Sequence, residues 1–372
     1  MRKSFLSFSA FFISIVVSTL LLSCKKEMVK PLSLENLKIM SLNVWSGLDY
    51  IGTFKMGEYE PVDVREKRYK ALLEEIAAVS PDVIGINEAN FLPDYVERLA
   101  KDINYDYIYH VGISGVRISR VGLPWNLREG DALLVRKGLF LEEVGRKQLS
   151  GGFVYNQASF HLEDATQVLV GKINTNGKNI YIAVTHLHSS PPDIKEYREK
   201  MNEYKERYDY SDKEYKIGLA EVLVNTKWRI DEAKLLLSYL KSVVPSGAPL
   251  ILMGDFNSEI GWPAMDVIMD GGFKDTFQQR ENKQQYTWDN KLNDNIKKYY
   301  PYDLNKKYDS LYGHMDKYLT LSRLRIDFIL INQNIFIESV TQSGVCGNKK
   351  YFDVHPSDHF GVYSQINLNK GI

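Results

Sequence analysis

The chain has 372 residues, of which 44% are hydrophobic and 25% are charged. This composition is ordinary for a soluble globular protein and excludes a disordered, collagenous or multi-span membrane chain. Lys plus Arg and Asp plus Glu both number 47, so the formal net charge is zero, and no strong basic bias indicates nucleic acid as the partner. Two cysteines, Cys24 and Cys346, exclude a disulfide framework, so packing must stabilise the fold.

The N-terminus has the pattern of a secretion signal. Arg2 and Lys3 precede an almost wholly apolar run over residues 5–22, and the polar residues 25–27 follow it. A transmembrane helix is the alternative interpretation, because about 18 apolar residues can just span a bilayer.

The end of this apolar run, Leu21-Leu22-Ser23-Cys24, resembles the lipobox of bacterial lipoproteins. The resemblance implies a signal peptide over residues 1–23, lipidation of Cys24 and a tether over residues 24–36. It also implies secretion across the inner membrane and a lipid anchor in a bacterial membrane, on the periplasmic side or at the cell surface. Cys346 would then be unpaired, most simply as a buried structural thiol.

Strand and helix patterns alternate along the rest of the chain and predict one domain over residues 37–368. Helices are expected at 65–79 and 228–244. Strands are expected at 37–45, 83–86, 132–135, 168–173, 180–186, 250–253, 325–331 and 361–366. The polar, Tyr-rich stretches near 189–224 and 289–320 are interpreted as inserted loops or short helices, because neither has enough apolar periodicity for a core of its own.

Polar residues follow several of these strands, where ligands gather in α/β proteins. Asn43 ends the first strand, and a turn former is its alternative role. Glu88 ends the second, where a carboxylate is costly unless it is paired or bound to a cation. His186 and His188 are two residues apart and are expected on one face of a strand. A zinc pair is possible in principle, but a catalytic acid plus a substrate contact is favoured, because no third His or Cys lies at ligand spacing.

The segment Gly254-Asp255-Phe256-Asn257 follows an apolar strand and carries the strongest signal. It places a carboxylate and an amide two residues apart, and oxygen ligands of this kind suit Mg²⁺. Asp327 is predicted inside a strand, where an acid needs a partner. Asp358 and His359 supply a metal or water contact and a base that Asp327 could orient.

The ordered motifs Ser-Leu-Asn, Ile-Asn-Glu, Thr-His-Leu, Gly-Asp-Phe-Asn, Ile-Asp-Phe and Ser-Asp-His resemble the endonuclease/exonuclease/phosphatase superfamily. The resemblance implies a four-layered α/β sandwich, in which two mixed β-sheets pack face to face with helices outside. It also implies hydrolysis of a phosphoester with Mg²⁺, with Mn²⁺ or Ca²⁺ as alternatives.

The resemblance also implies roles for individual residues. Glu88 matches the metal-binding glutamate, Asn43 is its companion, and Asp358 lies beside the metal. Asp255 and Asn257 match the pair that holds the attacking water and the phosphate. His186 matches the histidine that contacts the phosphate or protonates the leaving oxygen. His359 matches the general base, and Asp327 matches the acid that orients His359. Asp131 is a departure, since many relatives have Asn there; it either alters phosphate contacts or repeats a structural turn.

Substrate identity rests on a shorter segment. Thr287-Trp288-Asp289, followed by Asn290 or Asn293, is similar to a segment of sphingomyelinases. It favours a phospholipase C that acts on a lipid headgroup, with Trp288 and His188 as substrate contacts. Trp288 and the tyrosines between 299 and 312 are expected to approach the bilayer, and the protein is expected to be a monomer. A DNase-like nuclease is the second hypothesis, a phosphomonoesterase on inositol or sugar phosphates the third, and an inactive binding module the alternative of another class.

Overall fold

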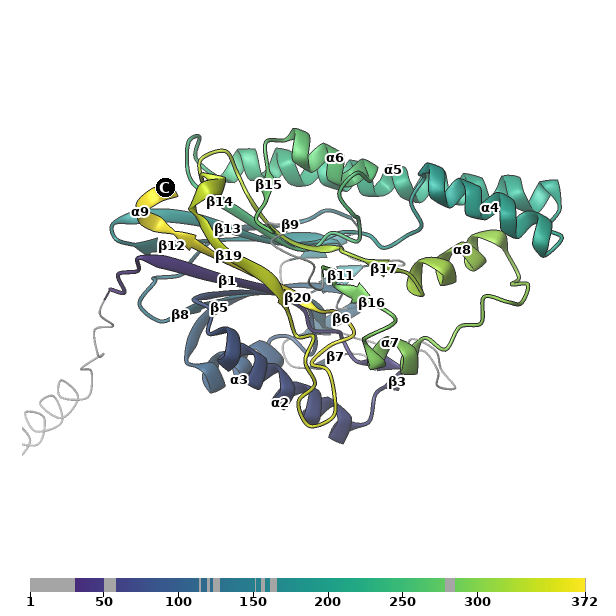
Figure 1. Ribbon diagram of the computed structural model, residues 1–372. Coiled ribbons are helices and arrows are strands. Elements are labelled where there is room, and N and C mark those ends of the chain that lie inside the picture. Colours follow the sequence, from purple (N-terminus) through teal and green to yellow (C-terminus); the bar gives the residue numbers. More distant parts are fainter. Residues whose placement is uncertain are drawn as a thin grey trace, which may run out of the picture. The chain divides into compact units, whose positions relative to one another are not determined.

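Two six-stranded β-sheets form the centre of the described part of the chain (Figure 1). The computed structural model describes residues 31–49, 58–113, 115–118, 121–122, 128–150, 152–154, 158–160, 166–277 and 285–371. The expected signal peptide and Cys24 lie outside these residues. Leu32–Ile372 form a compact unit of their own.

Each sheet is mixed, with one parallel pair among antiparallel neighbours in the described residues: β1 with β4 and β13 with β14. The first sheet has the order β19 (Val340–Cys346), β20 (Gly361–Asn367), β1 (Asn36–Asn43), β4 (Val83–Ala89), β8 (Glu129–Arg136) and β5 (Tyr105–Ile113). The second has the order β15 (Lys274–Asp275), β18 (Asp327–Ile331), β14 (Leu250–Asp255), β13 (Lys178–His186), β12 (Gln167–Thr175) and β9 (Glu142–Gln148).

All eight predicted strands are interior strands of these two sheets, and the four edge strands β19, β5, β15 and β9 escaped prediction. An interior strand of a covered sheet is apolar on both faces, whereas an edge strand carries more polar residues and gives a weaker pattern. β9, with the sequence Glu-Glu-Val-Gly-Arg-Lys-Gln, has no fully buried residue. Short strands complete the described set: β2 (Leu48–Asp49), β3 (Glu58–Tyr59), β6 (Gly115–Ile118), β7 (Val121–Gly122), β10 (Gly152–Val154), β11 (Ala158–Phe160), β16 (Trp288–Asp289) and β17 (Arg323–Leu324).

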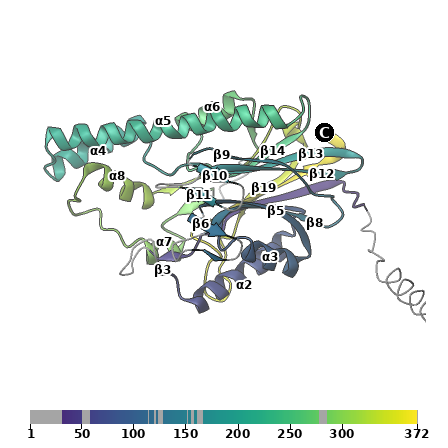
Figure 2. The same ribbon diagram turned by 180° about the vertical axis from the view of Figure 1, so that it is seen from behind.

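Helices cover the outer face of each sheet and complete four layers, as the views from the front and from behind show (Figures 1 and 2). α2 (Val62–Val79) and α3 (Asp94–Ile103) pack on the first sheet through an apolar cluster that includes Leu72, Leu99 and Ile84. α5 (Asp212–Val243) and α6 (Pro263–Asp270) pack on the second through Leu236, Met265 and Leu252. The predicted four-layered α/β sandwich is therefore confirmed.

The layer between the two sheets is apolar over most of its length. Leu37 and Ile39 of β1, Ile251 and Met253 of β14, and Ile329 of β18 all belong to one buried cluster. Successive residues of a strand point to opposite faces, so residues two apart share a face. The same inner face therefore continues along each strand into a polar residue at one end: Asn43, Asn87, Asp131, Gln167, His186, Asp255 and Asp327. Several of these residues form the candidate site described below.

The two inserts contain helices, one of the predicted alternatives, and they share a core. They contain α4 (Lys195–Arg207), the first part of α5, α7 (Asp294–Tyr299) and α8 (Leu311–Thr320). Their aromatic and aliphatic residues form one buried cluster that includes Tyr204, Met201, Ile296 and Met315. His314 is buried in it, with its ring stacked 4.0 Å from that of Tyr204. Each insert alone has too few apolar residues for a core, but the two together have enough.

Two of the aromatic residues that were expected to approach a bilayer are buried instead. Tyr299 is 1% exposed and Trp288 is 9% exposed, so both face inward.

α5 begins 16 residues earlier than predicted, at a capping box. In this box the side chain of Ser211 accepts the backbone N–H of Glu214, and the side chain of Glu214 accepts the backbone N–H of Ser211. Among helices built from described residues, none is long and apolar enough to cross a membrane.

Gly254 is expected to tolerate no side chain. Its φ is +138°, and a Cβ would collide with the backbone oxygen of Thr185 on the neighbouring strand. Gly254→Ala should therefore lower the free energy of unfolding by at least ~2 kcal/mol, as strained backbone plus a clash requires. Gly261→Ala is the control, because Gly261 also has a positive φ but open space around it. Equal losses in urea denaturation of the two variants would contradict the role of the clash.

Candidate active site

Strand register brings the polar strand ends together. β1 and β4 pair Asn43 with Asn87, β13 and β14 pair His186 with Asp255, and β14 and β18 pair Asp255 with Asp327. Parallel neighbours end at the same edge of a sheet, and the antiparallel β18 begins there. The predicted residues from both sheets therefore meet at one end of the inner layer.

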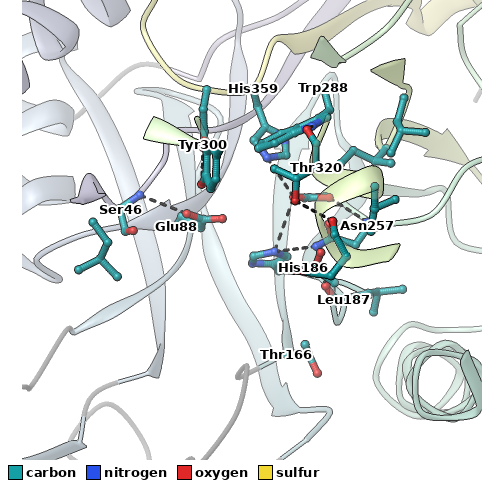
Figure 3. A pocket seen from close by; sticks show the side chains of 18 of the residues that line it. Ser46, Glu88, Thr166, His186, Leu187, Asn257, Trp288, Tyr300, Thr320 and His359 are labelled. Atoms are coloured by element: carbon teal, nitrogen blue, oxygen red, sulfur yellow. Dashed lines mark hydrogen bonds and ion pairs between the residues drawn. The ribbon is translucent and has the colours of Figure 1, made fainter. Parts of the chain in front are cut away.

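Glu88 turns into this site at an irregularity of its strand. The pairing of β4 with β8 shifts register between Ile86 and Ala89, and Glu88 has a φ of +56°. Its Oε1 accepts a hydrogen bond from Asn43 Nδ2 at 2.8 Å, and its Oε2 accepts one from Ser46 N at 3.2 Å (Figure 3). A residue held in this conformation by its surroundings is typical of a functional position.

Glu88, Asp255 and His359 form a set that fits a metal ion. One ligand atom from each lies within 4.8 Å of the other two. Asp255 is 1% exposed, and burial together with the nearby Asp327 raises the pKa of its carboxyl group. Crowded carboxylates of this kind are stabilised by a cation, and two carboxylates with an imidazole are donors that divalent metals accept.

His359 is held between two carboxylates. Its Nδ1 lies 3.0 Å from Asp327 Oδ2, and its Nε2 lies 3.7 Å from Asp255 Oδ2. Burial by itself lowers the pKa of His359, but Asp327 and Asp255 outweigh it and raise that pKa well above the usual value. The predicted neighbours Asp327 and His359 are thus in contact: Asp327 fixes the ring and leaves Nε2 facing the site.

His186 and Asn257 form the opposite side of the site. Asn257 Nδ2 lies 3.2 Å from His186 Nε2 and donates to Leu187 O at 2.9 Å (Figure 3). His186 Nε2 is 3.6 Å from Asp255 Oδ2. Burial lowers the pKa of His186, but Asp255, Glu88 and Asp131 together raise it to about 9. In the metal-free protein these carboxylates therefore favour the protonated form of His186.

Three predicted residues take other positions. His188 follows the end of β13, so the alternation of side chains between the two faces of a strand no longer applies to it. Its ring stacks on that of Trp228, with ring centroids 4.3 Å apart. It is not among the described residues that line the cavity. Asn43 turns its amide nitrogen toward the carboxylates, because its oxygen accepts Trp45 N–H at 3.0 Å. Asp358 lines the cavity but is outside the metal set, and burial raises its pKa to about 6. We therefore do not assign His188 to substrate contact or Asn43 to the metal.

Asp131, the departure from the family pattern, lies beneath the site and is fully buried. Its Oδ1 accepts Asn87 Nδ2 at 2.8 Å, and Asn87 Oδ1 accepts the backbone N–H of Asp255 at 3.0 Å. Burial raises the pKa of Asp131 to about 6. Asp131 thus fixes the Asn87 side chain, which in turn fixes Asp255. Asn87 was not predicted as a site residue, and its place in Ile-Asn-Glu was the available signal.

α5 contributes two buried charges that the sequence analysis missed. Arg229 is 2% exposed and donates to the carbonyl oxygen of Asn257, to Ser190 O at 2.8 Å and to Ser190 Oγ at 3.0 Å. One turn later, Glu232 is 1% exposed and accepts His188 N at 3.0 Å. Two charged residues three apart on one helix face were a usable signal, since buried charges need specific partners.

The Thr-Trp-Asp segment supports His359 from behind. Thr287 Oγ1 accepts the N–H groups of Ile326 and Asp327 at 3.0 and 3.1 Å. Asn293 Nδ2 donates to the carbonyl oxygens of Ser357 and Asp358 at 3.0 and 2.8 Å. The Trp288 ring stands against the His359 ring, 4.9 Å away, and it also lines the cavity as predicted. The segment thus mainly positions the backbone around Asp327 and His359.

These groups surround a cavity of about 370 Å³. The metal set, His186 and Asn257 occupy one part of its lining. Another part comes from the inserts, through Tyr300 and Tyr302 after α7 and Asp316 and Thr320 on α8. This is the size range of small-molecule sites.

Removal of the Asp327 carboxylate should lower the pKa of His359. NMR of the metal-free wild type should show an imidazolium that persists well above pH 6.5, and Asp327→Asn should shift that titration down. A raised folded-state pKa stabilises the fold in full below about pH 6.5, and this contribution is lost as the pH rises through the folded value. Asp358→Asn is the control and should shift the pKa less, because Asp358 contributes less than Asp327 and Asp255. An unchanged pKa in Asp327→Asn would refute the pairing.

Arg229→Met should leave the carbonyl oxygens of Asn257 and Ser190 without their donor. We expect a loss of about 1–3 kcal/mol in unfolding free energy and at least tenfold in kcat, since Asn257 loses its support. Arg229→Lys should recover part of both. Lys227→Met, at an exposed position two residues earlier on α5, serves as the control and should behave as wild type. Full activity in a folded Arg229→Met protein would show that Arg229 does not position the site.

Comparison with solved structures finds the same fold at low identity. TDP2 of D. rerio, in a complex with a single-strand DNA product, is 18% identical with a TM-score of 0.54, covering 90% of this chain and 100% of its own. A mannosyl-6-phosphatase of Bacteroides thetaiotaomicron is 18% identical with a TM-score of 0.53, covering 88% and 98%. The human Nocturnin catalytic domain, with bound sulfate, is 15% identical with a TM-score of 0.50, covering 90% and 95%. At such identities the likeness shows the fold alone.

No curated protein matches the chain at a significant level. The family described as endonuclease/exonuclease/phosphatase matches residues 40–359, which spans every residue of the site from Asn43 to His359. With this match and the four-layered fold, the chain belongs to the endonuclease/exonuclease/phosphatase family.

Proposed function

We propose that this protein is a metal-dependent phosphodiesterase that hydrolyses a membrane lipid at its headgroup, in the manner of a phospholipase C. Family membership supports metal-dependent hydrolysis of a phosphoester. The observation that carries the proposal is that ligand atoms of Glu88, Asp255 and His359 lie close together. His359 is also in hydrogen-bond contact with Asp327.

Each side chain has a task in this reaction. Glu88 and Asp255 would hold the cation, for which Mg²⁺ is our first choice because their ligands are oxygens. When bound, the cation would offset the charge of the phosphate and of the carboxylates, a condition that favours a neutral His359. Asp327 holds Nδ1 of His359, so Nε2 accepts the proton of the attacking water. His186 in its protonated form would donate a proton to the leaving oxygen, and Asn257 would position the phosphate beside it.

A lipid substrate is favoured over DNA by the charge of the site. Among the described residues that line the cavity there is neither Lys nor Arg. Proteins that bind DNA depend on such residues for phosphate contacts, and their affinity falls steeply with salt. The formal net charge of the chain is zero as well. We further propose that the protein is exported and tethered to a bacterial membrane through Cys24, for which the N-terminal sequence is the support.

Glu88→Gln should remove metal-dependent turnover and leave the fold intact, because the amide keeps the size of the side chain but loses its charge. Hydrolysis would be followed during a Mg²⁺ titration, and folding by circular dichroism. Glu97→Gln, the same change at an exposed site on α3, should titrate as wild type. An unaltered Mg²⁺ dependence in Glu88→Gln would remove Glu88 from the metal site.

His359→Ala should lose at least ~10²-fold in rate, the low end for general acid–base catalysis.

Substrate choice is tested separately. The chain without its signal peptide would be assayed with Mg²⁺ on sphingomyelin vesicles, plasmid DNA and p-nitrophenyl phosphoesters. We expect release of a phosphorylated headgroup with weak action on DNA and a mild salt dependence. Rapid nicking of the plasmid without headgroup release would favour a nuclease, and near-normal activity of His359→Ala would move the base to another residue.

A further inference from the structure

A second, small pocket lies next to the candidate active site, and the reaction proposed above does not use it. We call it the arginine pocket. Its lining includes Trp45 and Ser46 from the turn after β1, Arg65 and Arg68 from α2, and Pro356 from the segment that leads to His359. Ser46 also lines the active-site cavity, where its N–H donates to Glu88 (Figure 3).

The carbonyl oxygens of the arginine pocket already accept hydrogen bonds. Arg68 Nη1 donates to Val44 O at 3.0 Å and to Pro356 O at 2.8 Å. Arg65 Nη2 donates to Ser46 O at 2.7 Å. An occupant of the pocket would therefore meet N–H groups that need an acceptor, rather than acceptors that need a donor.

Trp45 supplies one such N–H group. The residue is 4% exposed, and its Nε1 is buried without a hydrogen-bond partner among the described residues. An indole N–H can only donate, and a buried one usually has a partner. The ring itself is held in place, because the Arg68 guanidinium lies 4.5 Å from its centroid and the Tyr299 ring lies 4.6 Å away. The structure thus leaves a fixed, buried donor beside the pocket.

Arg65 supplies further donors together with a charge. In the part of the chain that the structure describes, its side chain makes one hydrogen bond, the one to Ser46 O, although a guanidinium has five N–H groups. Glu60 is bound to Arg68, whose Nε donates to Oε1 at 2.8 Å, and lies 4.0 Å from Arg65 Nε. Burial lowers the pKa of Arg65, and Arg68 adds to this effect while Glu60 opposes it. Two guanidinium groups and one carboxylate leave one positive charge in excess.

The size of the arginine pocket limits what can occupy it. Its volume is about 20 Å³, which is room for one particle of about the size of a water molecule. Halide ions are only slightly larger than water, whereas sulfate and phosphate are several times larger. A water molecule could also accept these hydrogen bonds, but it carries no charge to balance Arg65.

We propose that the arginine pocket binds one monovalent anion of halide size, such as chloride, with Trp45 Nε1 and Arg65 as its donors. The anion completes the hydrogen bonding of the indole and balances the excess charge of the two arginines. It also joins the turn that carries Ser46 to α2, and the N–H of Ser46 in turn holds Glu88.

Bromide tests the position of the anion, because it replaces chloride and scatters anomalously. Crystals of the protein soaked in sodium bromide should show an anomalous peak between Trp45 and Arg65. Trp45→Phe keeps an aromatic ring but removes the donor. This variant should raise the dissociation constant of bromide at least ~10-fold, as expected for a lost hydrogen bond to a charged group.

Thermal unfolding tests whether the anion binds in solution. At equal ionic strength, bromide at about ten times its dissociation constant should raise Tm by about 2 °C over gluconate, which is too large for the pocket. Arg65→Met should abolish this difference. Lys67→Met, at an exposed position on the same helix, is the matched control and should keep it.

Neither measurement depends on hydrolysis, so the anion site and the proposed reaction are tested separately. A peak in the pocket, with a halide-dependent Tm that Arg65→Met loses and Lys67→Met keeps, would support the site. If Arg65→Met does not fold, Trp45→Phe takes its place in the same comparison. The absence of a peak would show that water fills the pocket. A peak with equal Tm in the two salts would show binding at crystal concentration only, and either result would overturn the proposal.

Discussion

The inner layer between the two sheets sets the constraint on which the site depends. A strand that faces another sheet must bury every second residue, and here those residues are apolar until the last one or two positions. Register then places Asn43 beside Asn87 and Asp255 beside both His186 and Asp327. Most polar groups in such a layer have little access to bulk water, so they need partners within the layer. The apolar part of the layer thus fixes the strands, and the strands fix the site.

Electrostatics makes this end of the layer suited to a cation. Glu88, Asp255 and Asp327 crowd around His359, and the raised pKa values of Asp255 and His359 are two consequences of the same crowding. Hydrogen bonds from Asn43 and from the backbone of Asn257 hold the carboxylates in place, and these neutral donors leave the carboxylate charge unchanged. Behind them, Asn87, Asp131 and Arg229 hold the residues that touch the site. The protein therefore keeps the negative charge together through its fold.

The sequence predicted those strands that are buried on both faces of a sheet. Interior strands such as 250–253 are apolar on both faces and end in a sharp polar segment, so both the strand and Asp255 could be predicted. Edge strands, the early start of α5 and the buried pair Arg229 and Glu232 were missed, because their signals are spread over polar stretches. His188 was misplaced because a strand pattern was extended past His186, where the strand ends. The shared core of the two inserts could not be foreseen, since it forms only when segments about a hundred residues apart pack together. Motif order located the candidate site, and only the packing shows which atoms face each other.

The cavity lining comes from two parts of this chain: the sheets supply Glu88, His186 and Asp255, and the second insert supplies Tyr300, Tyr302 and Asp316. The central claim, that Glu88 and Asp255 hold a divalent cation next to His359, can be measured directly by diffraction. Crystals grown with Mn²⁺, which replaces Mg²⁺ at oxygen-rich sites and scatters anomalously, should show an anomalous peak among these three side chains. A fully occupied peak elsewhere in the cavity, or none at saturating Mn²⁺, would contradict the account.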